Sequence, residues 1–443
     1  MNMAQDEILI RGGRIIDPAS GVDMVGDVLV SGGTIWKVGK KINHSRSAKV
    51  YDAGGLVVSP GFVDMHAHLR EPGREDEETI ESGAKAALKG GFTSIVAMPN
   101  TDPPIDSEGM VRLVIEKGEG AGAARVFPMA AITKGLKGES ISEMAHLREA
   151  GAVAFTDDGN PVSNAGTMRR ALEYASMLEC PVVSHCEETS LTKGGAMNEG
   201  AVSTALGLKG IPSVAEEIIV ARDILLSGFT GGRLHIAHMS TKESVDLIRR
   251  AKKMGTKVTA EATPHHIALT DELLRSYDTN FKMNPPLRKE DDRMALIEGL
   301  RDGTIDCIAT DHAPHTEIEK DVAFDDAPFG VTGLETALGV LITFLVEAGH
   351  LTLEQMVEKL SLSPSKILGL SSGTLRPGAQ ADITVFDPHL EWTVSPDDFL
   401  SKSRNSPFCG MKLAGHAVLV LVSGRALYES SKERMAPRGN QPA

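Results

Sequence analysis

Residues 60–70 bring together side chains that can bind a metal ion and, beside it, an acidic group. His66 and His68 stand two residues apart after an apolar run, and on an extended strand that spacing points both imidazoles to the same side. Arg70 keeps the spacing and offers a planar fork of donors that suits a carboxylate. The histidine pair alone would equally fit two polar residues on a half-exposed strand. Together with Arg70, it predicts half of a metal site that acts on an acidic small molecule.

The composition indicates a globular protein and argues against a nucleic-acid partner. The 443 residues carry a formal net charge of −14, and no stripe of Lys and Arg offers the positive surface that phosphates need. The longest apolar stretch, 337–346, is too short to span a bilayer, and the first residues show no signal peptide. The four cysteines form no CxxC pair. We therefore expect a cytoplasmic protein with reduced thiols and no membrane partner.

The middle of the chain alternates apolar strands with amphipathic helices, which is typical of parallel βα units. Eight strands can be counted, and they predict a (β/α)8 barrel of the TIM type over residues 60–371, with a doubly wound open sheet as the alternative. The predicted strands end near His66 and then cover residues 93–98, 125–130, 152–156, 181–185, 233–238, 257–261 and 306–310.

Both ends of the chain consist of short apolar runs separated by glycine turns. Gly12–Gly13 and Gly32–Gly33 each fall between two such runs, which favours hairpins in a small antiparallel sheet. The C-terminal part repeats this pattern. We predict one small β-sandwich domain built from residues 1–59 and 372–443.

Potential metal ligands fall where the predicted barrel strands end. Because a barrel of this type carries its reactive residues at the carboxyl ends of its strands, we expect these side chains to meet at one mouth. Four histidines and two carboxylates are more than one zinc ion needs, so two ions are expected, with Asp158 as the candidate bridge that lowers their repulsion. The predicted ligands are His66, His68, Asp158, His185, His238 and Asp311.

Seven motifs, taken together and in this order, resemble the amidohydrolase superfamily and, within it, the type I bacterial dihydroorotases. They lie at residues 60–70, 98–101, 155–159, 185–187, 235–240, 282–288 and 309–315. The resemblance implies a reversible cyclisation of N-carbamoyl-L-aspartate to L-dihydroorotate and water, a step of pyrimidine biosynthesis. It also implies a homodimer or a complex with aspartate transcarbamoylase as possible assemblies.

The resemblance also assigns ligands to each zinc ion. It places His66, His68, Asp158 and Asp311 on one ion, and Asp158, His185 and His238 on the other. Many relatives bridge their ions with a lysine at the end of the fourth strand, but residues 152–158 contain none, so an aspartate must serve. The choice of Asp158 over Asp157 rests on the motif. Asp311 is the expected catalytic acid and base.

The same resemblance suggests how the substrate is held. Arg70, Asn100 and His315 are expected at the substrate carboxylate, Asn284 at the ring, and backbone groups of Phe329 and Gly330 along the wall, with His68 beside them. The acidic run from Glu71 to Glu78 is predicted to be a solvated helix start.

Two rival functions remain open. A dihydropyrimidinase, hydantoinase or allantoinase would act on a neutral ring and have no use for Arg70. A non-catalytic subunit of aspartate transcarbamoylase would be expected to lack metal ligands, whereas all six are present here.

Overall fold

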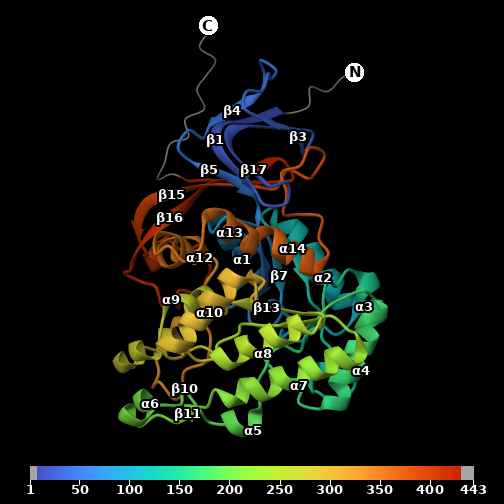
Figure 1. Ribbon diagram of the computed structural model, residues 1–443, viewed down its shortest axis with the longest axis vertical. Coiled ribbons are helices and arrows are strands. Elements are labelled where there is room, and N and C mark those ends of the chain that lie inside the picture. The colour runs from blue at the N-terminus through green and yellow to red at the C-terminus, as the bar shows by residue number, and fades with distance from the viewer. Residues whose placement is uncertain (1–6, 431–443) are drawn as a thin grey trace.

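The computed structural model describes residues 7–430, which form a barrel of parallel strands joined to a sheet made from both ends of the chain. Figure 1 shows the first and last strands, β1 and β17, together at one end of the molecule, with the helices of the barrel at the other. The predicted α/β fold is confirmed. Within the described residues, no helix has both the length and the apolar character needed to cross a bilayer.

Parallel strands follow one another around the barrel in sequence order. They are β6 (Phe62–Ala67), β7 (Phe92–Ala97), β8 (Arg125–Pro128), β9 (Val182–Ser184), β12 (Leu234–Ile236), β13 (Val258–Ala262) and β14 (Cys307–Ile308). Every residue of β6 and β7 is buried, as expected for parallel strands that are covered on both faces.

The predicted fourth strand, residues 152–156, is shorter than expected but still joins its neighbours. Only Phe155 forms ladder bridges, in parallel, with Ala130 on one side and Val182 on the other. Backbone hydrogen bonds from Val153 to the carbonyl of Pro128 and from Val183 to the carbonyl of Phe155 continue both pairings. This segment therefore connects the two halves of the barrel.

The seam between the first and the last strand lies next to the predicted ligands. Ala67 bridges His312 in parallel, and the amide of His68 donates to the carbonyl of His312 over 2.8 Å. Below them, Asp64 accepts hydrogen bonds from the amide and the hydroxyl of Thr310, at 2.8 and 2.5 Å. The barrel is thus closed.

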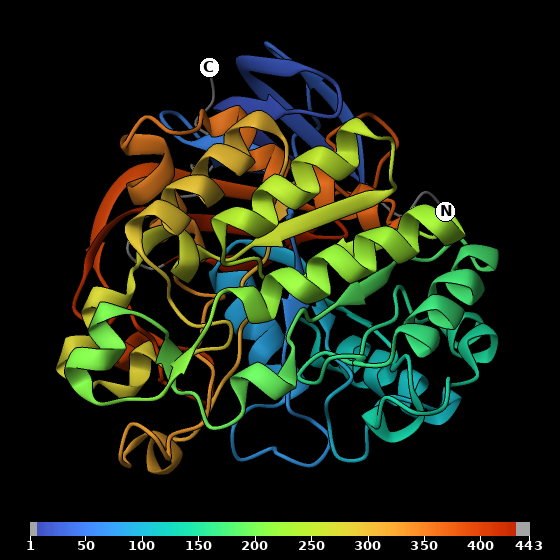
Figure 2. The same ribbon diagram turned by 60° about the horizontal axis from the view of Figure 1, so that its bottom comes forward.

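Helices pack around the outside of the barrel, and several begin at a side-chain cap. Thr79 caps α1 (Ile80–Lys89) through a reciprocal bond with Ser82, and such caps satisfy backbone donors that a helix leaves free. Helices α7 (Val214–Thr230) and α8 (Lys242–Lys253) lie side by side on the surface (Figure 2). The other long helices are α2 (Glu108–Ala121), α4 (Ala165–Met177) and α10 (Glu290–Asp302).

The two chain ends build one continuous sheet that curls on itself, as the predicted sandwich requires. Its order is β17-β16-β15-β5-β1-β2-β3, with β4 also paired to β1, and Thr34 at the start of β3 bridges back to Gln380. The bounds are β1 (Glu7–Asp17), β2 (Val22–Ser31), β3 (Thr34–Gly39), β4 (Lys49–Asp52), β5 (Val57–Pro60), β15 (Ile383–Thr393), β16 (Lys412–Val422) and β17 (Arg425–Glu429).

Two details of the predicted hairpins are wrong. Gly12–Gly13 is not a turn, because β1 runs through it with a bulge. Gly12 takes a φ of 74°, which glycine adopts easily, and its amide donates to Asp27 Oδ1 over 3.0 Å. The sheet is also not wholly antiparallel, since β1 pairs in parallel with both β4 and β5.

A segment between β15 and β16 leaves the sheet and packs against the barrel. Val394, Phe399 and Phe408 share one apolar cluster with Leu269 and Met283 of the barrel. The proposed division into residues 1–59 with 372–443 and residues 60–371 stays a prediction, and its outermost residues, 1–6 and 431–443, lie outside the described residues.

Candidate metal centre and active site

Ligand atoms from three strand ends converge at the mouth of the barrel. His66 Nε2 lies 3.3 Å from Asp158 Oδ2 and 3.5 Å from Asp311 Oδ1. His68 Nε2 lies 3.5 and 3.2 Å from the same two oxygens. Bonds of about 2.0–2.1 Å to a tetrahedral ion would put its ligand atoms about 3.3 Å apart. These four side chains therefore have the spacing of ligands around one ion.

A second group of ligand atoms faces the other oxygen of Asp158. His185 Nδ1 and His238 Nε2 lie 3.5 and 3.4 Å from Asp158 Oδ1, and the two ring nitrogens are 2.9 Å apart. Asp158 thus turns one oxygen toward each group. The structure brings all six predicted ligands together, in an arrangement consistent with a binuclear metal site.

The neighbouring Asp157 is turned away from this cluster. Its Oδ1 accepts a hydrogen bond from the amide of Thr133 over 2.9 Å, and its Oδ2 accepts one from the Thr133 hydroxyl. Burial raises the pKa of Asp157 to about 6. The geometry therefore favours Asp158 as the shared carboxylate.

The buried cluster also has the charge balance of a cation site. Although burial opposes it, Asp158 and Glu187 raise the pKa of His185 to about 10, and Asp158 and Glu261 raise the pKa of His66 well above its usual range. Among the described residues, His66 Nε2 and Asp158 Oδ1 are buried without a hydrogen-bond partner. The negative charge of these carboxylates favours positive charge beside them, and metal cations bound to the ring nitrogens and carboxylate oxygens can supply it.

A carboxylate that the sequence argument did not select orients two of these histidines. Glu261 at the end of β13 is fully buried. Its Oε1 lies 2.7 Å from His66 Nδ1 and accepts a bond from the amide of His238, while its Oε2 lies 3.1 Å from His235 Nε2. Such a partner fixes the ring and leaves His66 Nε2 for a metal. Like the predicted ligands, Glu261 lies at the end of a predicted strand, and this position could have identified it from the sequence.

A cavity of about 180 Å³ opens beside the cluster. Asp158, His185, His238 and Asp311 line it together with six of the seven predicted substrate residues, namely His68, Arg70, Asn100, Asn284, Phe329 and Gly330. The seventh, His315, lies one layer behind Arg70, with its Nε2 3.3 Å from Arg70 Nη2. An outer pocket of about 680 Å³ shares Asn284 and Phe329 with this cavity.

The two asparagines of the cavity wall are linked by hydrogen bonds to His68 and His185 of the cluster. Asn100 Oδ1 lies 2.9 Å from His68 Nδ1. Asn284 Nδ2 donates to Glu187 Oε2, which in turn lies 3.0 Å from His185 Nε2. The wall and the ligands therefore hold one another in place.

The prediction that the acidic run from Glu71 to Glu78 is a solvated helix start is wrong for its last two residues. Glu77 and Glu78 are buried. Glu77 Oε2 lies 3.0 Å from Arg70 Nε, and its Oε1 lies 2.8 Å from His315 Nδ1. Periodicity alone could not reveal this role, because the partners are distant in sequence.

Three residues of the site hold the backbone in the left-handed region that L-residues rarely adopt. The φ angles of Arg70, His238 and Asp311 are 61°, 28° and 47°. Such strain persists where surrounding contacts impose it, and it is concentrated at functional sites. The local backbone thus supports the functional importance of this mouth.

Comparison with known proteins agrees with the site. Residues 55–244 match the model of the dihydro-orotase-like family. A dihydroorotase from Pelotomaculum thermopropionicum is 55% identical over 423 residues, covering 96% of this chain and 99% of the relative. A dihydroorotase from Geobacter metallireducens is 52% identical over 422 residues, covering 95% and 99%. The solved L-hydantoinase (dihydropyrimidinase) from Arthrobacter aurescens is 26% identical, with a TM-score of 0.85 over 96% of each chain.

The solved neighbour shares the fold of this chain, and both sequence relatives are dihydroorotases that match it along nearly their whole length. Identity above one half along nearly the whole of both sequences is far more than a shared fold requires. The chain therefore belongs to the dihydroorotase family of the amidohydrolase superfamily.

Proposed function

We propose that the chain interconverts N-carbamoyl-L-aspartate and L-dihydroorotate with two zinc ions at the barrel mouth. The observation that carries the proposal is the position of Arg70 in the wall of a cavity that also contains the metal-facing side chains. The guanidinium suits a substrate carboxylate, which dihydroorotate has and the neutral hydantoins and dihydropyrimidines lack.

The donor set suits zinc and divides between the two ions. His66, His68, Asp158 and Asp311 would hold one ion, and Asp158, His185 and His238 the other, through nitrogen and oxygen ligands that zinc accepts. When bound, such ions lower the pKa of water and polarise a substrate carbonyl. Glu261 contacts His66 Nδ1 and Glu187 contacts His185 Nε2, so these carboxylates would leave the opposite ring nitrogens free to bind the ions.

Asp311 is the proton carrier of the proposed reaction. In the hydrolytic direction its carboxylate accepts a proton from the attacking water and delivers it to the ring nitrogen as the C–N bond of the ring breaks. In ring closure it takes a proton from the carbamoyl nitrogen, which bonds to the carboxyl carbon, and delivers that proton to the oxygen that leaves as water. His68 Nε2 lies 3.2 Å from Asp311 Oδ1. Together with nearby His66 and His238, it outweighs burial and keeps the pKa of Asp311 low, so the carboxylate starts ionised in the metal-free protein.

The remaining wall orients the substrate. Arg70 would pair with its carboxylate, with Asn100 and His315 beside it, while the amides of Asn284 and the backbone at Phe329–Gly330 would face the ring. Amide side chains carry both donors and acceptors, as a cyclic imide requires.

A turnover assay tests the proposal. The zinc-loaded protein should hydrolyse L-dihydroorotate and cyclise N-carbamoyl-L-aspartate, with dihydrouracil and hydantoin turned over far more slowly. Preference for the neutral rings would instead favour a hydantoinase activity. A protein that retains no zinc and turns over none of these compounds would favour a non-catalytic subunit of aspartate transcarbamoylase.

We further propose that the protein acts in the cytoplasm, as a homodimer or in complex with aspartate transcarbamoylase. The support is the family membership, and size-exclusion chromatography with light scattering, alone and with aspartate transcarbamoylase, tests it.

A further inference from the structure

Two buried lysines hold the loop that carries Phe329 and Gly330 into the cavity wall. Lys282 Nζ donates to the carbonyls of Phe324 and Asp325, at 2.7 and 2.9 Å, and lies 4.8 Å from the centre of the Phe329 ring. The amide of Gly330 donates to the carbonyl of Lys282 over 3.0 Å. The loop is therefore fastened to the segment around Lys282 at several points.

The second lysine, Lys320, ties this segment to the loop through carbonyls alone. It ends α11 (Glu317–Lys320), and its Nζ donates to the carbonyls of Thr279, Lys282 and Pro328, at 3.1, 3.3 and 2.8 Å. Within residues 7–430, it forms no ion pair with a carboxylate. Burying an ammonium without an anion costs folding free energy. The three carbonyls offset part of this cost, which indicates that the ammonium serves to hold them together.

Close packing and hydrogen bonds at Gly330 restrict the positions that this loop can take. Gly330 takes a φ of 135°, and a Cβ added there would lie 2.8 Å from the Cβ of Ala313. Asn405 Nδ2 donates to the carbonyls of both Ala313 and Gly330, at 3.2 and 3.0 Å. A small displacement of Pro328 would therefore move the cavity wall itself.

We propose that Lys320 is a positioning residue for substrate binding: its ammonium fastens Pro328 to residues 279–282 and so keeps Phe329 and Gly330 in the cavity wall. This inference rests on the proposed function wherever dihydroorotate is the readout. Lys320 touches neither the cavity nor the metal-facing side chains, and it acts only through the backbone of the loop.

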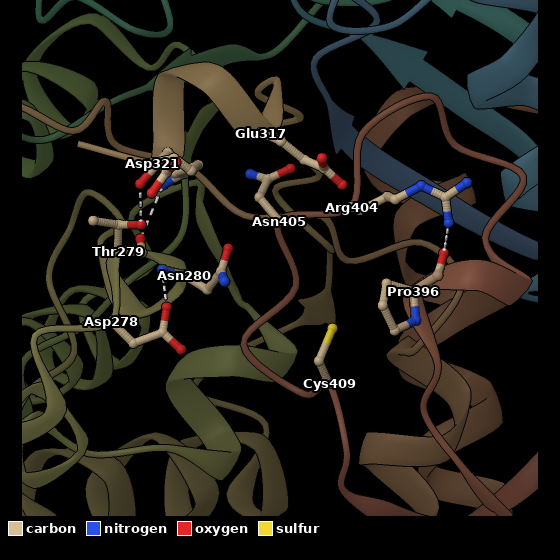
Figure 3. A pocket seen from close by; sticks show the side chains of 10 residues that line it. Asp278, Thr279, Asn280, Glu317, Asp321, Pro396, Arg404, Asn405 and Cys409 are labelled. Atoms are coloured by element: carbon tan, nitrogen blue, oxygen red, sulfur yellow. Dashed lines mark hydrogen bonds between the residues drawn. The ribbon is translucent and has the colours of Figure 1, made fainter.

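Lys320 also helps to line a separate pocket of about 430 Å³. Figure 3 shows this pocket between Thr279 and Asp321 on one side and Pro396 and Arg404 on the other, with Asn405 also at its edge. This pocket shares no lining residue with the catalytic cavity.

The charged groups around Lys320 leave it partly protonated near neutral pH. Burial, followed by the like charge of Lys282, lowers its pKa to about 7, with Arg70 acting in the same direction and Asp278 and Glu319 acting against it. Further charges border the pocket at Glu317, Asp321 and Arg404. Above this pH the neutral amine has one hydrogen fewer to donate, and the fastening weakens.

The test replaces Lys320 by Met and, in a second variant, by Gln. At pH 6, the KM for dihydroorotate should rise by about tenfold in K320M, the effect of one lost charged hydrogen bond, with kcat nearly unchanged. The wild-type KM should rise as pH passes 7, whereas the KM of either variant should lack that rise. Hydrogen exchange of the backbone amides of residues 329–331 should be faster in both variants than in the wild type.

Lys359→Met is the matched control. Lys359 is also buried, and its Nζ donates to the carbonyl of Ile305, before β14 and thus at the opposite end of the barrel. This variant should keep the wild-type KM and pH profile, and an equal rise in KM would overturn the proposal. So would wild-type rates of hydrogen exchange at residues 329–331 in K320M and K320Q. If the wild type does not turn over dihydroorotate, the proposed function fails, while the exchange measurement still decides the role of Lys320.

Discussion

Replacing Asp158 and Asp157 separately by Asn tests the central geometry, because the two carboxylates are adjacent and face different partners. Asp158 turns one oxygen to each group of histidines, whereas both oxygens of Asp157 bind Thr133. The Asp158→Asn side chain would keep one oxygen and present an amide donor to the other group, and that donor cannot act as a metal ligand. The Asp157→Asn side chain would keep the bond from the Thr133 amide.

The expected magnitudes differ widely. Losing a group that merely supports a ligand costs about 10- to 100-fold in metal affinity or activity, so losing a ligand shared by two ions should lower kcat/KM by more than about 100-fold. In Asp157→Asn the hydrogen bond with the Thr133 hydroxyl changes, which is about 1 kcal/mol of folding free energy, and a buried charge is removed, but no contact with the histidines of the cluster is lost. Activity of the Asp157→Asn variant should stay within about threefold of the wild type.

Two measurements decide between these expectations. Elemental analysis after dialysis should find less than the wild-type zinc content in D158N and the wild-type content in D157N. Thermal unfolding with and without EDTA should show the Tm decrease that chelation causes in the wild type and in D157N, but a smaller one in D158N. If D157N loses metal and D158N does not, the assignment of the shared carboxylate is refuted.

Three further predictions follow from the surroundings of the site. Glu261→Gln keeps an acceptor for His66 but removes the charge, so zinc affinity should fall by about 10- to 100-fold in competition with a chelator, and an unchanged affinity would contradict that role. Arg70→Met should raise the KM for dihydroorotate by about 10- to 100-fold, whereas Arg74→Met should not, because Arg74 shares Glu77 but does not line the cavity. In the metal-free protein, burial raises the pKa of Asp157 from 3.8 to about 6. The contribution of this group to folding stability is therefore fully present below pH 3.8, where Asp157 is neutral, and is lost as pH rises through 6. That loss should be roughly 2–3 kcal/mol in urea unfolding of the wild type and absent in D157N; parallel profiles would refute it.

The sequence predicted the ligand cluster better than its supports, for a physical reason. His66, His68 and Asp311 follow apolar strands, and the geometry of a parallel barrel brings strand ends together whatever the loops do. Glu77, in a turn, contacts Arg70, and Asn405, in the segment after β15, contacts His315. Hydrophobic periodicity in the sequence does not predict such long-range contacts. The bulge at Gly12–Gly13 was missed because a glycine pair fits a turn and a bulge equally well.

The closed seam of the barrel also has a consequence for synthesis of the chain on the ribosome. His66 and His68 emerge early, but the strand that pairs beside them ends at Ile308, and Asp311 follows it. Until some 250 further residues have been made, the histidines have neither their neighbouring strand nor the last carboxylate. Tight binding of metal ions should therefore come late in biogenesis, after the final barrel strand has docked.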